Sequence, residues 1–144
     1  MDAAFWQRIS AEPRYLDGTR HPLEMTPAEV EQVYLPLARR ILVLPRLPRR
    51  VVVAIAGPPG SGKSAFAAAL ALVLNALSAG TEAAVVGMDG WHYPNRYLEE
   101  HALRSQKGAP ESYNFAALRD FLRRARRSTR LAYPIYSRET HDPM

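Results

Sequence analysis

The sequence predicts an α/β domain with a parallel sheet, and three observations support this fold class. Residues 51–56 (VVVAIA) form a short apolar run rich in β-branched side chains, and residues 83–88 (AAVVGM) form a second apolar run. Such runs are typical of strands that are buried on both faces of a parallel sheet. The alanine- and leucine-rich residues 63–77 between them are long enough for about four helical turns. Strand, helix and strand in this order predict a right-handed βαβ unit.

A helix is predicted before this unit, beginning at Thr26 and Pro27. A cap residue, a proline at the first helical position, early acids and late arginines are the expected order for a helix. Pro36 predicts a kink within it. The expected buried face consists of Val30, Val33, Tyr34, Leu37 and Ile41.

The run at residues 44–50 (LPRLPRR), with two prolines and three arginines, is interpreted as a linker. We therefore divide the chain into an N-terminal helical segment with its linker, residues 1–48, and a core, residues 49–144. Both belong to a single domain overall, because 144 residues is the size of one ordinary domain.

The polar and aromatic stretch after residue 88 predicts a loop with a short helix near residues 96–103. Asn114 is the predicted cap of a further helix that runs to about residue 127. Residues 130–136 (RLAYPIY) are a candidate third strand. The predicted buried stripe of the helix after Asn114 is Phe115, Leu118, Phe121 and Leu122.

Composition excludes several classes of protein. The chain has no cysteine, which excludes disulfide frameworks and thiolate metal sites. No secretory signal is evident, and the longest apolar stretch, residues 65–77, is too short to span a bilayer, so we expect a cytoplasmic protein with no membrane partner. The net charge of +5 suits an anionic partner, and nucleotides are anions too. The sequence is also compatible with a homodimer.

A phosphate-binding loop is predicted from the pattern G-x-x-x-x-G-K-[ST] at residues 57–64. Glycines let backbone N–H groups point inward, and the following helix offers its positive end. Lys63 would reach the β- and γ-phosphates of ATP, and the Ser64 hydroxyl would bind Mg²⁺. The alternative is a glycine-rich turn without a ligand. The predicted nucleotide-binding residues are Gly57, Pro58, Pro59, Gly60, Ser61, Gly62, Lys63, Ser64 and Ala65.

Such a loop indicates a nucleotide but not a reaction, because GTPases, ATPases and small-molecule kinases share it. A regulatory GTPase is disfavoured, since no N-K-x-D motif is present. Asp89 follows the second predicted strand, at the sheet edge where ligands bind. Its carboxylate could associate with Mg²⁺, could act as a general base toward an acceptor hydroxyl, or could cap a turn before Gly90.

Three further motifs follow the phosphate loop: MDGWHYPNRYL at residues 88–98, KGAPESYN at residues 107–114 and PIYSRETHDP at residues 134–143. In order and spacing they resemble the P-loop kinases that group pantothenate kinase with uridine kinase. They are most similar to a bacterial branch of nucleoside/nucleotide kinase-like or fructose-transport-associated kinases. The resemblance covers roughly residues 30–143.

The resemblance implies a P-loop NTPase fold of three layers, α/β/α, around a parallel sheet, and transfer of the γ-phosphoryl of ATP to a hydroxyl of a small metabolite. Asp89 would be the base, and Lys63 would act on the phosphates. Tyr136 would line the acceptor pocket, and His141 matches a substrate-contacting histidine. His92 and Tyr93 would lie on the acceptor side.

Two departures bear on the acceptor. Pantothenate kinases carry a histidine two residues after the pocket tyrosine, where this chain has Arg138, and this disfavours pantothenate. The guanidinium could instead pair with a carboxylate or phosphate on the acceptor. Asn114 stands where the relatives usually have Asp, so a hydrogen bond from there to an acceptor would be neutral.

The chain stops after the H-D-P segment, before the further strand and the arginine-bearing lid of such kinases. We therefore expect a C-terminally truncated kinase, with a sheet that is incomplete at the C-terminus. The alternative is a module that binds nucleotide without transferring phosphate.

Structural interpretations remain open for several of these residues. Trp91 is expected to pack rather than to bind, while His92 and Tyr93 could serve either in a pocket or in a core. His141 could be a solvated residue near the end of the chain. The arginine-rich residues 122–130 predict a solvated basic face. Nucleic acid is disfavoured as a partner, because no aromatic platform accompanies this charge.

Overall fold

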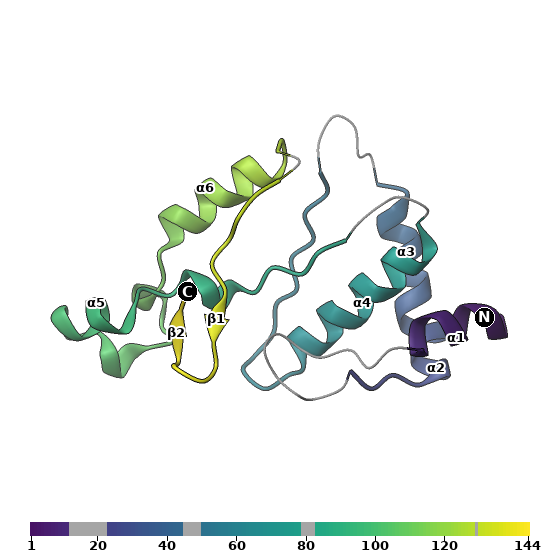
Figure 1. Ribbon diagram of the computed structural model, residues 1–144, viewed down its shortest axis with the longest axis horizontal. Helices are drawn as coiled ribbons and strands as arrows, with labels where there is room; N and C mark the ends of the chain where they lie inside the picture. Colours follow the sequence, from purple (N-terminus) through teal and green to yellow (C-terminus); the bar gives the residue numbers. More distant parts are fainter. Residues whose placement is uncertain (12–22, 45–49, 79–82, 129) are drawn as a thin grey trace. The chain divides into compact units, whose positions relative to one another are not determined.

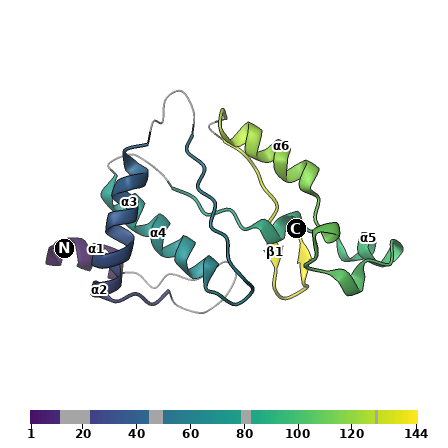
Figure 2. The same ribbon diagram turned by 180° about the vertical axis from the view of Figure 1, so that it is seen from behind.

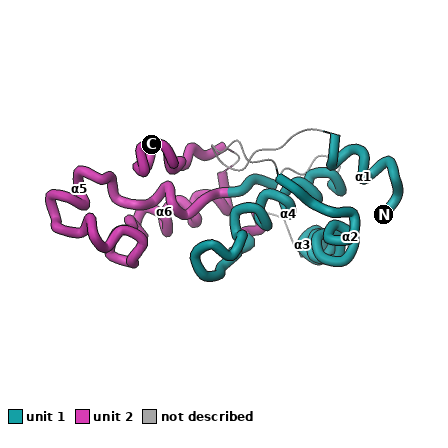
Figure 3. The backbone as a smooth tube through the Cα atoms, turned by 90° about the horizontal axis from the view of Figure 1, so that it is seen from below, with its two compact units in different colours: residues 1–45, 53–85 teal, residues 46–52, 86–144 magenta. Residues whose placement is uncertain are grey.

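The structure is a computed structural model that describes residues 1–11, 23–44, 50–78, 83–128 and 130–144. The chain divides into two compact units, residues 1–45 with 53–85 and residues 46–52 with 86–144 (Figure 3). Residues 45–49 of the predicted linker at 44–50, and with them the boundary after residue 48, lie outside the described residues.

The first unit begins with helix α1 (Ala3–Ser10), which sequence patterns did not single out. Asp2 caps this helix, because its carboxylate accepts a hydrogen bond of 2.7 Å from the backbone N–H of Phe5. Phe5 and Ile9 lie one turn apart on its buried side. This cap and this spacing are the sequence signals of α1.

The helix predicted from Thr26 is confirmed, and it is built from three parts: α2 (Pro27–Glu29), the π-helical η1 (Val30–Tyr34) and α3 (Leu35–Leu42). Thr26 and Glu29 form a capping box at its start. The π turn lies just before Pro36, where the backbone N–H of Leu35 bonds to Val30 O, five residues back.

The π turn changes which side chains of this helix are buried. A π turn adds a residue to one turn of the helix, so every later position rotates relative to an α-helical pattern. Val33, expected on the buried face, is exposed, whereas Leu35 and Ala38 are buried. The predicted face is therefore right at Val30 and wrong at Val33, because the prediction assumed 3.6 residues per turn throughout.

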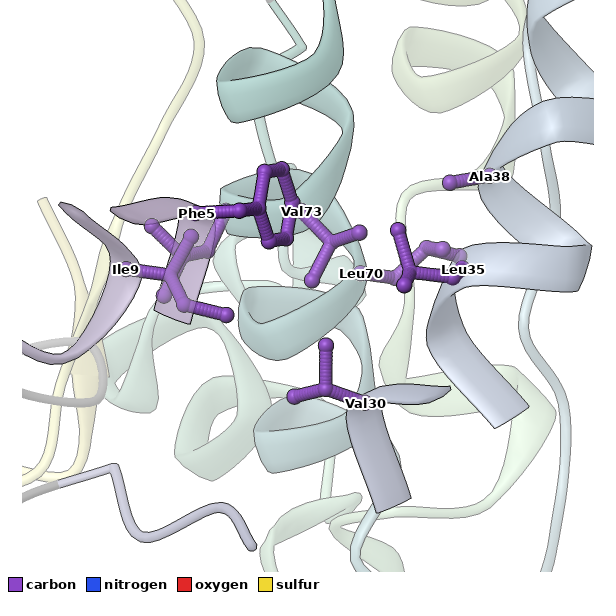
Figure 4. Packing of buried hydrophobic residues seen from close by; sticks show 8 residues of the cluster. Phe5, Ile9, Val30, Leu35, Ala38, Leu70 and Val73 are labelled. Atoms are coloured by element: carbon purple, nitrogen blue, oxygen red, sulfur yellow. The ribbon is translucent and has the colours of Figure 1, made fainter. Parts of the chain in front are cut away.

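Helix α4 (Lys63–Leu77) has the bounds that the sequence predicts, and it forms the centre of the first unit. Both ribbon views show α1, α3 and α4 side by side (Figures 1 and 2), and their apolar side chains meet in one cluster (Figure 4). Each large side chain buried there contributes about 1.5–3 kcal/mol. The buried members of the cluster are Phe5, Ile9, Val30, Leu35, Ala38, Leu70, Leu72 and Val73.

The second unit contains short helices and one small hairpin. In chain order these are η2 (Met88–Trp91), α5 (Asn95–Glu100), η3 (Arg104–Gln106), η4 (Pro110–Ser112), α6 (Phe115–Ala125), β1 (Tyr136–Ser137) and β2 (Asp142–Pro143). The strands β1 and β2 are antiparallel, with Tyr136 opposite Pro143 and Ser137 opposite Asp142. The short helix expected near residues 96–103 corresponds to α5, and the helix capped by Asn114 corresponds to α6.

The core of the second unit forms where α6 packs on η2. Trp91 is buried against Phe121, with ring centroids 4.9 Å apart, so its predicted packing role is confirmed. Ala125 completes the buried cluster. The predicted stripe is right at Phe121, which is buried, and at Leu118, which packs partly buried against the cluster. It is wrong at Phe115 and Leu122, which are 46% and 37% exposed, because the buried face of α6 continues from Phe121 to Ala125.

The predicted parallel sheet is not seen among the described residues, whose only sheet is the β1–β2 pair. Residues 51–56 and 83–87 carry neither helix nor strand, and Val52 and Val53 are about half exposed. A parallel strand takes its hydrogen bonds from neighbouring strands, and none of the described residues supplies such a ladder. Both segments also include a boundary between the units, at 52/53 and 85/86. Among the described helices, none has the length and apolar content needed to cross a membrane.

Gly90 allows two backbones to touch in the second unit. A Cβ atom at this position would overlap the carbonyl group of Pro134 and lie 3.3 Å from the backbone N of Ile135. Both neighbours are main-chain atoms, so neither can rotate away as a flexible side chain would.

We therefore expect Gly90→Ala to lower the free energy of unfolding by about 3 kcal/mol, the upper range for overpacking. Urea titration followed by tryptophan fluorescence, to which both Trp91 beside Gly90 and Trp6 of α1 contribute, measures the change. Ser105→Ala, at an exposed position of η3, is the control and should stay within about 0.5 kcal/mol of the parent. An unchanged urea midpoint for Gly90→Ala would contradict the contact.

Candidate functional site

The predicted phosphate loop lies directly before α4. Gly60 and Gly62 have φ angles of 75° and 82°, and Gly62 is the N-cap of the helix, where a side chain would be strained. The backbone N–H of Phe66 bonds to Gly62 O, so the amides of residues 63–65 precede the first intrahelical hydrogen bond. Free amides at the positive end of a helix are the arrangement that binds anions in proteins.

Lys63 folds back over the loop. Its ammonium Nζ donates a hydrogen bond of 2.7 Å to the backbone oxygen of Pro58, five residues earlier. The backbone N–H of Ser61 also points to Pro58 O, at 3.3 Å. The loop is thus closed by its own lysine, and Ser64, the predicted Mg²⁺ ligand, is exposed one residue further along.

A second group of functional side chains surrounds Asp89 in the second unit. Asp89 lies in η2 and is exposed, and the Tyr113 hydroxyl lies 3.5 Å from its Oδ1. The Tyr113 ring stacks on the His92 ring, with centroids 3.8 Å apart. Burial raises the pKa of Tyr113, and the negative charge of Asp89 adds to this, so the phenol keeps its proton and can donate to the carboxylate.

His92 is 8% exposed and is fixed through Ser112. Its Nδ1 lies 3.1 Å from Ser112 Oγ and 3.3 Å from Ser112 O. The hydroxyl of Ser112 donates its single proton to the carbonyl of Ala109, at 2.7 Å, so its oxygen can only accept a hydrogen bond from His92. Both contacts of Nδ1 are therefore satisfied when Nδ1 is the protonated nitrogen of the ring. In that tautomer the lone pair of His92 lies on Nε2.

The backbone joins these residues into one framework. The N–H of Tyr93 donates to Ser112 O at 2.8 Å, and the N–H of Asn114 donates to Trp91 O at 2.8 Å. Asn114 uses its side-chain oxygen to cap α6 through the N–H of Ala117, at 3.0 Å. The motif KGAPESYN is thereby attached to the motif that contains Asp89.

Tyr136 approaches this group from strand β1. Its ring lies 5.8 Å from the His92 ring, centroid to centroid, and the ammonium of Lys107 lies 5.1 Å from its centroid. Asp89, His92 and Tyr136 therefore lie in one region of the second unit. Tyr93 stacks on Tyr97 of α5, with centroids 4.3 Å apart.

Arg138 and His141 lie in the exposed turn between β1 and β2. His141 has a φ of 52°, the left-handed conformation, and its backbone oxygen accepts a hydrogen bond from Lys107. The structure thus gives His141 a contact through its main chain. Lys63 and Asp89 belong to different units, so each is placed only within its own unit.

Sequence patterns gave no role to Tyr113 and Lys107, although both belong to the quoted motif KGAPESYN. The signal that could have pointed to them is their position in KGAPESYN, because this motif is one of those whose order along the chain matches the P-loop kinases. Among the residues that the structure describes, no three His, Asp or Glu side chains gather to bind a metal.

Comparison with known proteins gives relatives of this chain, although no protein-family model matches it. It is 31% identical over 131 residues to YggC, an uncharacterized protein of Escherichia coli (strain K12), across 90% of this chain and 55% of that protein. It is 29% identical over 136 residues to a pantothenate kinase of Streptococcus gordonii, across 83% of this chain and 44% of that kinase. A protein of Silicibacter sp. TM1040 described as a fructose transport system kinase has a crystal structure that matches 78% of this chain and 55% of its own, with a TM-score of 0.71 and 36% sequence identity.

These comparisons confirm the resemblance carried by the motifs: the chain is a relative of P-loop kinases of the pantothenate kinase group. The chain spans about half the length of these three relatives. The similarity to the crystal structure supports a P-loop α/β fold, whereas the described residues show only a two-stranded sheet.

The burial of His92 predicts a pH dependence of stability. Burial lowers the pKa of His92; the hydrogen bond to the Ser112 backbone and the charge of Asp89 oppose this shift, and the charge of Lys107 adds to it. The folded state therefore takes up a proton on His92 less readily than the unfolded state, whose histidine has a pKa near 6.5. The stabilisation is fully present above that pH and is lost as the pH falls below it, until the folded-state pKa is passed.

We expect the urea midpoint of the parent protein to fall between about pH 6.5 and pH 5.5, a window above most carboxyl pKa values. In His92→Asn, whose amide can replace the Nδ1–H donor, this fall should be smaller. The exposed His101 provides the matched control, and His101→Asn should retain the full pH dependence. Equal slopes for His92→Asn and the parent would show that His92 does not cause the effect.

Proposed function

We propose that the protein is an ATP-dependent small-molecule kinase that transfers the γ-phosphoryl group to a hydroxyl of a small metabolite. The observation that carries this proposal is the loop of residues 57–64, where a lysine and the free amides of a helix N-terminus face one turn. Its relatives include proteins named as kinases, which supports phosphoryl transfer over other nucleotide chemistry. The acceptor class covers nucleosides, pantothenate-like compounds and sugars.

On the nucleotide side, the amides of the loop would bind phosphate oxygens, and Lys63 would leave Pro58 to bind the β- and γ-phosphates. Mg²⁺ would bind Ser64 and the phosphates. This fits the chemistry of the residues present, because Mg²⁺ usually keeps several waters and few protein ligands in such sites. Bound Mg²⁺ supplies charge neutralisation on the phosphates.

On the acceptor side, Asp89 would take the proton of the acceptor hydroxyl while the hydroxyl oxygen attacks the γ-phosphorus. The bond between the γ-phosphorus and its bridging oxygen would break, and ADP would leave with that oxygen. The exposed carboxylate is free to meet a ligand, and the Tyr113 phenol would steady it. His92, Tyr93 and Tyr136 would line the acceptor pocket, together with His141 and Arg138 of the turn between β1 and β2.

We also propose that residues 51–56 and 83–88 belong to a parallel sheet within a three-layer α/β/α fold. Their apolar, β-branched composition supports this, as does the similarity to the crystal structure of the fructose transport system kinase. Pairing in such a sheet would cover Val52 and Val53.

Two substitutions separate binding from transfer. We expect Lys63→Ala to weaken the binding of ATP·Mg²⁺ at least about tenfold, because charge-assisted contacts to phosphate are worth more than 1.4 kcal/mol. Asp89→Asn should leave ATP affinity unchanged and should reduce acceptor-stimulated ADP release about 10²–10⁴-fold, the usual contribution of a general base. Titration calorimetry measures the first effect, and an ADP-release assay with pantothenate, nucleosides, fructose and sugar phosphates measures the second.

Asp120→Asn is the matched control for Asp89→Asn, because Asp120 pairs with Arg124 on the exposed side of α6. It should leave both measurements unchanged. ATP binding that depends on Lys63, with no turnover for any acceptor, would replace the kinase proposal by a nucleotide-binding module.

A substitution at Arg138 tests whether the acceptor carries a negatively charged group. If its guanidinium pairs with a carboxylate or phosphate of the substrate, Arg138→Ala should raise the acceptor KM about tenfold and leave kcat nearly unchanged. Arg96→Ala removes a second exposed arginine, one that is paired with Glu100 on α5, and serves as the control. An unaltered KM for Arg138→Ala rules the pairing out.

A further inference from the structure

We infer that Lys107 is a positioning residue that fastens the β1–β2 hairpin to α5 and so fixes the place of Tyr136 in the acceptor pocket. The kinetic part of this inference rests on the proposed kinase function; the structural part does not. The contacts of Lys107 with Asn95, His141 and Tyr136 carry it.

The ammonium group of Lys107 uses two of its three donors within the protein. A lysine ammonium carries three N–H donors and no acceptor. One donor bonds to Asn95 Oδ1 at 2.6 Å, and another bonds to the backbone oxygen of His141. The Tyr136 ring, 5.1 Å away at its centroid, attracts the cation through its π face. Two hydrogen bonds and one cation–π contact thus join Lys107 to three other parts of the unit, which favours a structural anchor.

The hairpin needs such anchors because it is very short. β1 and β2 contribute two residues each, and beyond them Ile135 and Met144 exchange two backbone hydrogen bonds, of 2.8 and 3.2 Å. An isolated two-stranded hairpin is at best marginally stable in water. Tertiary contacts therefore decide whether this hairpin is formed.

Two of these contacts meet at Asn95, the first residue of α5. The backbone N–H of Asn95 donates to Asp142 Oδ1 at 2.7 Å, and its side-chain oxygen accepts from Lys107. Arg104 donates to the same oxygen. α5 is itself held in place by Leu98, which is fully buried. The hairpin is thus fastened to an element with its own buried anchor.

The conformation of His141 is the second, independent observation. Its φ of 52° is unfavourable for a residue with a side chain, and it places the His141 carbonyl on Lys107. The contact requires the backbone at this position and makes no use of the imidazole. Glycine, which adopts this conformation freely, should therefore replace His141 without loss of the contact.

Hydrogen–deuterium exchange tests the anchor without any need for activity. In Lys107→Met, which keeps the length of the side chain but has no donor, we expect the amides of residues 135–144 to exchange about tenfold faster, while those of α6 stay unchanged. Arg96→Met, the same type of change at a 90% exposed arginine of α5, should alter neither segment. Lys107→Arg retains a cation with several donors and should keep exchange within about threefold of the parent. Unchanged exchange of residues 135–144 in Lys107→Met overturns the inference, as does equal acceleration in Lys107→Arg.

Kinetics then test the effect on Tyr136. Lys107→Met should raise the acceptor KM about tenfold, with the affinity for ATP·Mg²⁺ unchanged and kcat lowered much less. His141→Gly should match the parent in the exchange of residues 135–144, because glycine keeps the backbone carbonyl that Lys107 contacts. Faster exchange of the hairpin in His141→Gly would overturn the role of the backbone. If the parent shows no turnover with any acceptor, the kinase proposal fails. The exchange experiment then still tests whether Lys107 holds the β1–β2 hairpin against α5.

Discussion

The second unit depends on the close approach of two backbones at Gly90. Because no side chain stands between η2 and residues 134–135, the hairpin segment can lie directly on the turn that carries Asp89. Trp91, the next residue, then fills the core against Phe121, and His92 meets both Tyr113 and Tyr136. One glycine thus places a carboxylate, an imidazole and a phenol of the candidate acceptor site in the same neighbourhood.

The two halves of the proposed chemistry differ in how they are stabilised. The phosphate loop draws its geometry from local backbone conformation and from a long helix with a well-packed apolar side. The acceptor side is assembled from short helices and a hairpin, whose order depends on side-chain hydrogen bonds between distant parts of the sequence. Local sequence therefore determines the first site largely by itself, whereas the second requires the tertiary structure of its unit.

This difference explains what could be predicted from the sequence. The bounds of α4, the cap of Asn114 and the packing of Trp91 follow from periodicity and local preferences, and they are confirmed. The exposure of Val33 could not be foreseen, since a π turn has no simple sequence signature. The contacts of Lys107 and Tyr113 span up to 34 residues of sequence and arise only from tertiary structure. The parallel sheet was expected from two apolar runs that flank a helix and from the resemblance to P-loop kinases, and none of the described residues supplies the neighbouring strands that a ladder requires.

The bond between Lys63 and Pro58 changes what nucleotide affinity would mean for this loop. The ammonium already has a partner of full hydrogen-bond quality before any phosphate arrives. In the proposed function Lys63 leaves Pro58 for the phosphate, and the released carbonyl oxygen then turns to water. The measured affinity would therefore reflect a change of partner for Lys63, from the neutral carbonyl to the charged phosphate. Only the difference in free energy between these two interactions would favour binding.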